Sequence, residues 1–212
     1  MTGEMTMSWI ALLILGAFHG INPGMGWLFA VALGMQERRR GAVVRALLPL
    51  GLGHALAVGA AVLVAVAVGI AVPLHYLQWP VAAILIAVGV SRFFRHRHPR
   101  WAAMRVGMGG LTLWSFLMAT AHGAGLMVVP VFLGMAVKAE ASCHAGHSAA
   151  GAPITALLAT SMHAVGYLAV TAVVAILVFE KFGVGLLRKA WVNLDLIWAA
   201  SLIATGILTI AI

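Results

Sequence analysis

Residues 82–89 read Ala82-Ala83-Ile84-Leu85-Ile86-Ala87-Val88-Gly89, and residues 199–206 read Ala199-Ala200-Ser201-Leu202-Ile203-Ala204-Thr205-Gly206. The two stretches are identical at six of eight positions, although they lie in opposite halves of the chain. Alanine-rich apolar helices match by chance fairly easily, so this pair does not establish a repeat alone. A repeat requires further matches between the two halves, in the same order along the chain.

Two further blocks match in that order. Phe18-His19-Gly20 pairs with Ala121-His122-Gly123, and Gly53-His54-Ala55-Leu56 pairs with Met162-His163-Ala164-Val165. Three blocks in register indicate an internal repeat, with residues 1–105 as the first unit and residues 106–212 as the second. Together the two units are expected to form one membrane domain.

Each unit contains three apolar runs of spanning length, because a hydrocarbon layer of about 30 Å requires roughly 20 apolar residues of helix. The predicted spans are Trp9–Gly34, Val43–Val72, Leu77–Phe94, Gly107–Val137, Pro153–Phe179 and Val192–Ile212. Since three crossings are an odd number, the second unit must enter the membrane from the side opposite to the first. The sequence therefore predicts an all-α integral membrane protein of six transmembrane helices, built as two inverted three-helix repeats.

The composition agrees with a lipid environment. Of the 212 residues, 63% are hydrophobic and only 8% are charged, which excludes the charged surface that a soluble protein needs. The net charge of +8 is interpreted as an orientation signal and not as a nucleic-acid footprint. Twelve of the thirteen basic residues fall in the first, third and fifth segments between spans: Arg38, Arg39, Arg40, Arg45, Arg92, Arg95, Arg97, Arg100, Arg105, Lys181, Arg188 and Lys189.

The positive-inside rule places those three segments in the cytoplasm and both termini outside a bacterial-type inner membrane. Only Lys138 lies in a segment on the other side. The chain begins Met1-Thr2-Gly3-Glu4, without the basic stretch that opens a signal peptide, so we expect its first span to stay attached. The sequence leaves open whether copies of the chain form a homo-oligomer.

Two of the spans are expected to be broken. Asn22-Pro23-Gly24-Met25-Gly26 lies near the middle of the first span, and His122-Gly123-Ala124-Gly125 followed by Pro130 interrupts the fourth. Proline removes a backbone donor, and glycine weakens a helix. Broken backbone at membrane depth is tolerated only where protein or a water-filled cavity satisfies the freed groups. Both breaks are therefore expected to face inward, toward one another.

Four of the nine histidines lie near the centres of spans, where an ionisable group is most costly: His19, His54, His122 and His163. A single such residue is more often a neutral imidazole bonded to a neighbouring helix. Four at matched depth, duplicated by the repeat, favour a shared site, and neutral imidazole is the commonest protein ligand of transition metals. Asn22 and Met25 follow His19 along one helix face and are expected to assist.

At these residues the chain resembles the NicO nickel/cobalt transporters and related urease-accessory membrane proteins, within the lysine-exporter superfamily. That family carries an early His-Ala-Leu-Asp-x-Asp-His motif, a basic loop and a Gly-His-Thr/Ala-Leu motif. The corresponding residues are His19-Gly20-Ile21-Asn22-Pro23-Gly24-Met25, Arg38–Arg40 and Gly53-His54-Ala55-Leu56. The resemblance implies a transition-metal permease, with His19 and His54 among the ligands.

The chain departs from that family at its carboxylates. Asn22, Gly24 and Met25 stand where the family has two aspartates and a second histidine, and no Asp or Glu lies in the core of any predicted span. A histidine and methionine set suits a softer or singly charged ion such as Cu(I), so the ion is left open among Cu, Ni, Co and Zn. Cys143, His144 and His147, in the outer segment between the fourth and fifth spans, are a possible metal-capture site.

Three functions follow from these residues. The leading hypothesis is a metal permease that binds its ion through His19, Asn22, Met25, His54, His122 and His163, and that works by rocking one half against the other. A membrane b-type cytochrome is the alternative, since paired intramembrane histidines also ligate haem. A membrane metalloenzyme with a fixed metal ranks third, because the sequence offers no nucleophile motif and no general base other than histidine, and we assign no catalytic residue.

Overall fold

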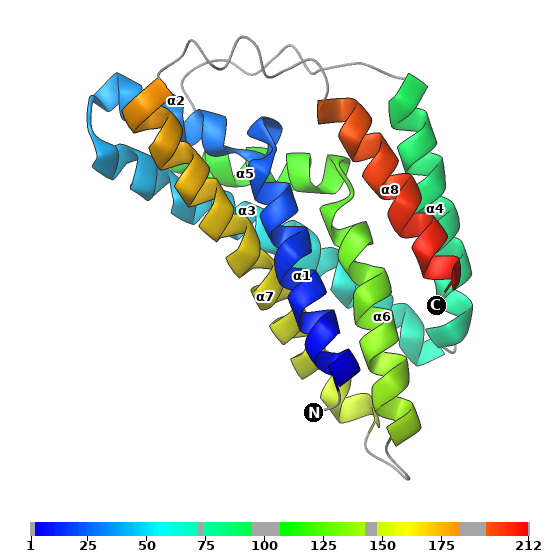
Figure 1. Cartoon of the computed structure of the whole chain (residues 1–212). Coiled ribbons are helices and arrows are strands. Elements are labelled where there is room, and N and C mark those ends of the chain that lie inside the picture. The colour runs from blue at the N-terminus through cyan, green and yellow to red at the C-terminus, as the bar shows by residue number, and fades with distance from the viewer. Residues whose placement is uncertain (1–2, 72–73, 95–106, 143–147, 183–193, 212) are drawn as a thin grey trace.

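A computed structural model describes residues 3–71, 74–94, 107–142, 148–182 and 194–211. All regular secondary structure in these ranges is helical (Figure 1). The elements are α1 Gly3–Ile21, the 3₁₀ turn η1 Pro23–Met25, α2 Trp27–Glu37, α3 Arg40–Ala71, α4 Leu74–Phe94, α5 Met108–Ala121, α6 Ala124–Ser142, α7 Ser148–Leu177, the π turn η2 Val178–Phe182 and α8 Leu194–Ala211.

Two of these helices are long and apolar enough to cross a membrane by themselves. They are Arg40–Gly69 of α3 and Pro153–Lys181, which is α7 continued into η2. The pair Met108–Ala121 and Ala124–Ala136, bent by 62°, makes a third if it is counted as one span. The other predicted spans are represented among the described residues by shorter apolar helices. The described chain is thus a helical protein with two or three helices of membrane-spanning length, fewer than the six predicted from the sequence.

The first predicted span is interrupted where its sequence indicates. α1 ends at Ile21, Asn22 has extended backbone, and its side-chain Oδ1 accepts a hydrogen bond from the Gly24 amide at 2.9 Å. Pro23 starts η1, where its missing N–H costs nothing. Gly26 has a φ of +132°, a conformation that other residues rarely adopt, and α2 starts at the next residue.

The fourth predicted span is interrupted between α5 and α6. His122 closes α5, and its amide donates to the Met118 carbonyl at 2.9 Å. Gly123 follows with a φ of +73°, in the left-handed region that favours glycine, and α6 begins at Ala124. The chain turns at Gly123, and α5 and α6 are bent by 62° relative to each other.

Close backbone contacts hold the helices around the centre of the molecule. α1 packs along α7, and α3 packs along both α5 and α7 (Figure 1). A Cβ on Gly16 would lie 2.0 Å from the His163 carbonyl oxygen, and one on Gly166 would lie 2.2 Å from that of Leu13. A Cβ on Gly53 would lie 2.2 Å from the Thr112 carbonyl oxygen. Glycine at these three positions therefore lets the helices approach closely.

The pair α4 and α8 makes a reciprocal contact. A Cβ on Gly89 would meet the Ala199 carbonyl oxygen at 2.9 Å, and one on Gly206 would meet that of Ala82 at 3.0 Å. Ala82 and Gly89 begin and end the first copy of the repeated stretch, and Ala199 and Gly206 do so in the second. Each helix therefore presents the same two residues to the other.

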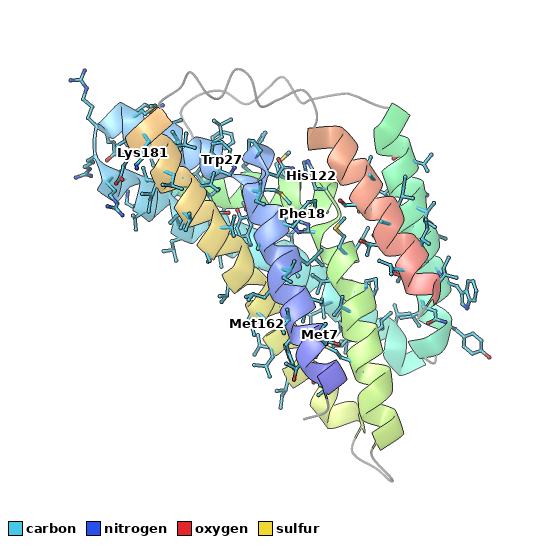
Figure 2. The ribbon with its side chains drawn as sticks, in the orientation of Figure 1. Met7, Phe18, Trp27, His122, Met162 and Lys181 are labelled. Atoms are coloured by element: carbon cyan, nitrogen blue, oxygen red, sulfur yellow. The ribbon has the colours of Figure 1, made fainter. Side chains whose placement is uncertain are left out.

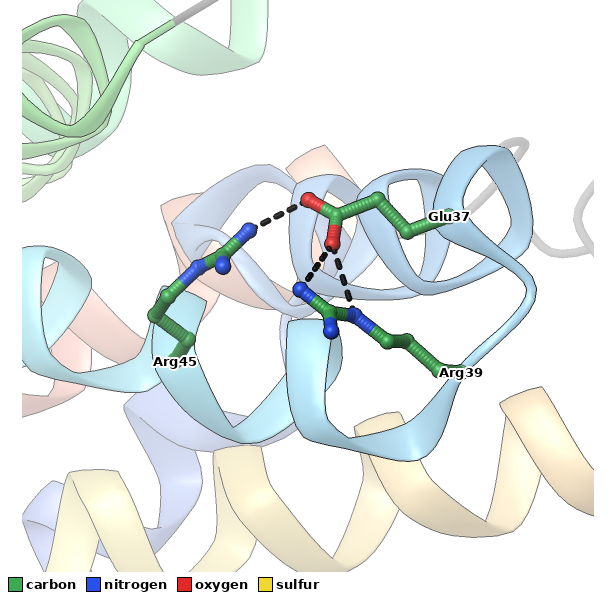
Figure 3. Close-up of polar contacts among 3 residues, drawn as sticks. All are labelled: Glu37, Arg39 and Arg45. Carbon is green, nitrogen blue, oxygen red and sulfur yellow. Dashed lines mark hydrogen bonds and ion pairs between the residues drawn. The ribbon is translucent and has the colours of Figure 1, made fainter.

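Charged side chains gather at the end of the bundle formed by the α2–α3 turn and η2. Glu37 accepts hydrogen bonds from Arg39, whose Nε lies 3.0 Å away, and from Arg45 (Figure 3). Arg40 pairs with Glu180 of η2 at 3.2 Å. Exposed ion pairs of this kind contribute at most about 1 kcal/mol each. The Arg40–Glu180 pair joins the start of α3 to η2, which follows α7.

Candidate functional site

Three histidines from three helices meet in the centre of the protein. His19 lies in the last turn of α1, His54 lies in α3, and His163 lies in α7. None of the three has any exposed surface. Their ring centroids form a nearly equilateral triangle, with sides of 5.1 Å between His19 and His163, 5.3 Å between His54 and His163, and 5.7 Å between His19 and His54. We call these three residues the histidine triangle.

Within the triangle, His54 and His163 face each other through a nitrogen–nitrogen hydrogen bond. Their Nε2 atoms are 3.1 Å apart, and their ring planes differ by 12°. A centroid separation of 5.3 Å is close to the largest that this nitrogen–nitrogen distance allows, so the rings meet edge to edge and not face to face. One Nε2 must donate its proton and the other must accept it, since a hydrogen bond needs one of each.

The third member, His19, has its tautomer fixed by the backbone. Its Nδ1 lies 2.7 Å from the Leu15 carbonyl oxygen, four residues earlier in α1. A carbonyl oxygen can only accept, so Nδ1 carries the proton and Nε2 keeps its lone pair. Histidines that bind metals usually have this arrangement, in which the second nitrogen donates to a carbonyl or carboxylate and orients the ring.

His122, the repeat partner of His19, has the same local geometry but a different exposure. Its Nδ1 lies 2.8 Å from the Met118 carbonyl oxygen, again four residues earlier, and a break in the helix follows directly. Unlike the histidine triangle, His122 is only partly buried. The structure therefore brings together three of the four predicted histidine ligands, and His122 occupies a more exposed position at the break between α5 and α6.

The two assisting residues expected from the sequence have structural tasks in the first break. The Asn22 side chain accepts from the Gly24 amide and caps η1, and Asn22 is 5% exposed. The Met25 side chain is buried in the same apolar cluster as Leu12 and Phe132. The Met25 carbonyl accepts a hydrogen bond from the hydroxyl of Tyr167, which lies in α7. Neither observation places the Asn22 amide or the Met25 sulfur against the imidazoles.

Tyr167 contacts the histidine triangle, although the sequence patterns did not predict it as a site residue. Its ring stacks on that of His54, with a centroid separation of 3.9 Å and an interplanar angle of 8°. Its hydroxyl donates to the Met25 carbonyl at 2.6 Å, and the side chain is fully buried. Tyr167 therefore joins a histidine to the break between α1 and α2. Its spacing offered a signal, because Tyr167 lies four residues after His163 and shares its helix face.

The acidic residues of the chain lie near helix ends. The acidic residues of the chain are Glu4, Glu37, Glu140, Glu180 and Asp195, and each lies within the first or last few residues of a helix or in η2. Among the described residues, no group of three or more His, Cys, Asp or Glu is arranged to hold a metal ion as it stands. The predicted capture site at Cys143, His144 and His147 falls outside the described residues.

No family model, no curated protein and no solved structure matches this chain. The resemblance to the NicO transporters therefore depends only on the residues quoted for it in the first two predicted spans.

Proposed function

We propose that this protein is a permease for a transition-metal ion, which binds between His19, His54 and His163. The proposed topology is six spans in two inverted repeats within a bacterial-type inner membrane, with both termini outside. The observation that carries the proposal is the histidine triangle itself. Three buried imidazoles from three helices are costly at membrane depth, and ionisable groups held there usually line a pathway or bind a ligand.

The size of the triangle suits a tris-histidine site. Three imidazoles bound to one tetrahedral ion through nitrogens about 2.0–2.1 Å from the metal have ring centroids roughly 5 Å apart and nitrogens roughly 3.3 Å apart. The observed centroid separations run from 5.1 to 5.7 Å, and the Nε2 atoms of His54 and His163 are 3.1 Å apart. Binding an ion between these nitrogens requires the edge-to-edge pair to tilt and to widen by a few tenths of an ångström.

The protonation states of the three histidines are also compatible with binding an ion. The Nδ1 of His19 donates to the Leu15 carbonyl, so its Nε2 carries the lone pair that a metal ligand requires. The shared proton between His54 and His163 must leave the space between the two nitrogens when an ion enters. When His54 is the donor, its Nδ1, which is buried and has no hydrogen-bond partner among the described residues, can take that proton instead of Nε2.

The donor set favours a soft or singly charged ion. Neutral imidazoles bring no negative charge, and no carboxylate of the chain lies within the central part of a helix. A divalent ion would keep both of its charges uncompensated in a site of low dielectric constant. Cu(I) is therefore expected to bind best, ahead of Zn(II), Co(II) and Ni(II).

Two contacts support the inverted repeat. His54 and His163 occupy equivalent positions in the second matched block, and they meet each other at the 3.1 Å contact. The equivalent glycines Gly89 and Gly206 pack on each other's helix in the same way. Residues related by a two-fold axis contact their own equivalents in this manner. An axis through the histidine pair would put the site where the two halves meet, as alternating access requires.

Metal titration tests the proposal. Purified protein in detergent is titrated separately with Cu(I), Zn(II), Co(II) and Ni(II), in competition with a chelator of known affinity. We expect one ion per chain for at least Cu(I). His163→Gln should weaken that binding by at least about 10–100-fold, because an amide keeps a hydrogen bond to His54 but is a poor ligand for a soft ion.

His98→Ala is the matched control, because His98 lies in a basic segment outside the described residues. This variant should bind as the unmodified protein does. The metal site is refuted if His163→Gln binds the ion as tightly as the unmodified protein does. It is also refuted if none of the four ions binds to the unmodified protein. Counterflow of the bound ion in proteoliposomes then separates a permease from a protein that keeps its metal.

The haem alternative receives less support from the same geometry. Axial histidines must stand roughly 4 Å apart, twice a metal–nitrogen bond of about 2 Å, with a flat macrocycle passing between them. The His19 ring lies beside the midpoint of the His54–His163 pair, in the space that the macrocycle would need. The visible spectrum of the purified protein distinguishes the two, since a haem protein is red.

A further inference from the structure

Positive charge is concentrated at the end of the bundle that contains the α2–α3 turn and η2. Lys181 marks this end in Figure 2, and Met7 and Met162 lie toward the other. The described cations here are all exposed, and they outnumber the carboxylates by three: Arg38, Arg39, Arg40, Arg45 and Lys181 against Glu37 and Glu180. A surplus of this kind attracts an anion.

Arg39 and Arg45 share a single carboxylate, that of Glu37 (Figure 3). One oxygen of Glu37 accepts from Arg39, whose Nε lies 3.0 Å away, and the other accepts from Arg45. The Arg39 side chain is 63% exposed and that of Arg45 is 49% exposed. Each guanidinium has several N–H donors in a planar fork that suits phosphate oxygens. Two positive charges against one negative charge therefore leave both charge and donors for a second anion.

Arg45 also stands at the head of an apolar line on α3. Leu52, Leu56 and Leu63 follow Arg45 by 7, 11 and 18 residues, which places them within about 20° of it around the helix axis. The three leucines are 53%, 52% and 62% exposed. His54 follows Arg45 by nine residues and lies on the opposite, buried face. Because α3 is long and apolar enough to cross a membrane, its exposed line suits contact with acyl chains.

We infer that this end of the protein binds one anionic phospholipid, whose phosphate lies against Arg39 and Arg45 and whose acyl chain follows the apolar line of α3. The basic residues and the leucines together select this ligand, because a soluble anion makes no use of the leucines and a neutral lipid makes no use of the arginines. The rise from Arg45 to Leu56 is about 16 Å, close to one leaflet of a hydrocarbon layer about 30 Å thick.

The source of the lipid follows from the orientation of the chain. The positive-inside rule assigns the α2–α3 turn to the cytoplasmic leaflet, where anionic lipids attract basic segments near a helix end. The inference goes beyond the proposed metal permease and makes no use of the histidine triangle. It requires only that α3 crosses a membrane with Arg45 at the level of the headgroups.

Glu37 competes with the lipid phosphate for the same two guanidiniums. Replacing Glu37 with an uncharged residue keeps both arginines and removes their partner, so lipid binding should become stronger. Replacing Arg45 removes a charged donor, so lipid binding should become weaker. These opposite responses distinguish a phosphate site from a loss of folding, which would weaken binding in both variants.

Native mass spectrometry of the whole protein in a neutral detergent measures this binding. The protein is titrated with dioleoyl-phosphatidylglycerol and, separately, with dioleoyl-phosphatidylcholine. We expect the first phosphatidylglycerol to bind at least about tenfold more tightly than phosphatidylcholine. Arg45→Gln should weaken it by about three- to tenfold, and Glu37→Gln should strengthen it by about threefold or more.

Two variants in α6 control for net charge. Lys138→Gln and Glu140→Gln make the same two charge changes near the end of α6, which lies at the other end of the bundle from the α2–α3 turn (Figure 1). Both should bind phosphatidylglycerol as the unmodified protein does. Glycerophosphoglycerol carries the same headgroup without acyl chains, and it should bind at least about tenfold more weakly than the lipid.

Equal affinity for the two lipids would overturn the inference, as would unchanged affinity in both Arg45→Gln and Glu37→Gln. An equal loss in Lys138→Gln would also overturn it, because the effect would then be one of net charge. Binding of glycerophosphoglycerol as tightly as the lipid would make the arginines a site for a soluble phosphate instead. His163→Gln should bind phosphatidylglycerol normally, so the lipid site and the metal site stand or fall separately.

Discussion

The Nε2 atoms of His54 and His163 are joined by a hydrogen bond 3.1 Å long, although neither residue has exposed surface. The bond closes a contact between α3 and α7 in the middle of the molecule, and each ring is the other's partner. Two polar groups that satisfy one another in this way depend on both being present. That dependence gives a prediction about stability that is separate from metal binding.

Replacing both members of this pair should cost less than the sum of the two single replacements. His54→Leu or His163→Leu leaves one buried Nε2 without its partner, and we expect a loss of about 1–3 kcal/mol in the free energy of unfolding. The double variant removes both polar groups, so its loss should be smaller than the sum of the single losses. Thermal unfolding in detergent, followed by tryptophan fluorescence, measures all three. Additive losses would show that the two imidazoles do not depend on each other.

Tyr167 offers a way to separate its hydroxyl from its ring. Tyr167→Phe removes the hydrogen bond to the Met25 carbonyl and keeps the stacking on His54, so the free energy of unfolding should fall by about 0.5–1.5 kcal/mol. Tyr167→Ala also removes the ring and should cost about 3–5 kcal/mol. Metal affinity should fall mainly in the second variant, since the ring positions His54. Equal metal affinity in the two variants would contradict a positioning role for the ring.

The close helix contacts should tolerate no added side chain. Gly16→Ala places a Cβ against the His163 carbonyl oxygen, and Gly53→Ala places one against that of Thr112, so each should destabilise the fold by about 1–3 kcal/mol or more. Gly134→Ala is the matched control, because Gly134 lies in α6 and a Cβ there meets nothing within 4 Å. It should be neutral or stabilising by up to about 1 kcal/mol. Similar melting temperatures for all three would argue against this packing.

Asn22 distinguishes a helix cap from a metal ligand. Asn22→Ala should lose about 0.5–2 kcal/mol of stability, because the Gly24 amide loses its acceptor. Asn22→Ser restores an acceptor that commonly caps helices, so it should recover most of that stability. Both variants should bind Cu(I) as the unmodified protein does once they are folded. A large loss of affinity in Asn22→Ser would return Asn22 to the ligand set.

Sequence patterns were sufficient for the helical class and for the places where two helices break. Pro23 and Gly123 act locally, through a missing donor and a left-handed φ, so their effects can be predicted without knowing the neighbours. The helix lengths were harder to predict. Because the first break is complete, α1 and α2 are separate helices, and the run from Trp9 to Gly34 does not form one continuous helix.

The site was predictable in its composition but not in its arrangement. The histidines were identified from their depth in the spans, whereas the exposure that separates His122 from His19 depends on how the helices pack. Tyr167 has no unusual sequence context, and only its face on α7 connects it with His163. Asn22 was interpreted as a ligand because its spacing from His19 fits a helix, but the helix ends at Ile21. Local backbone geometry therefore gives Asn22 a capping role, and its role as a ligand stays a prediction.

The break between α1 and α2 leaves its carbonyl groups engaged by side chains. The Ile21 oxygen accepts from the Trp27 indole at 2.9 Å, and the Met25 oxygen accepts from the Tyr167 hydroxyl. In transporters with unwound helices, carbonyls of this kind coordinate sodium or other hard cations. In this protein the Ile21 and Met25 oxygens already accept hydrogen bonds, so they are less available to alkali and alkaline-earth ions. Discrimination against such abundant ions would then follow from the indole and the phenol as much as from the imidazoles.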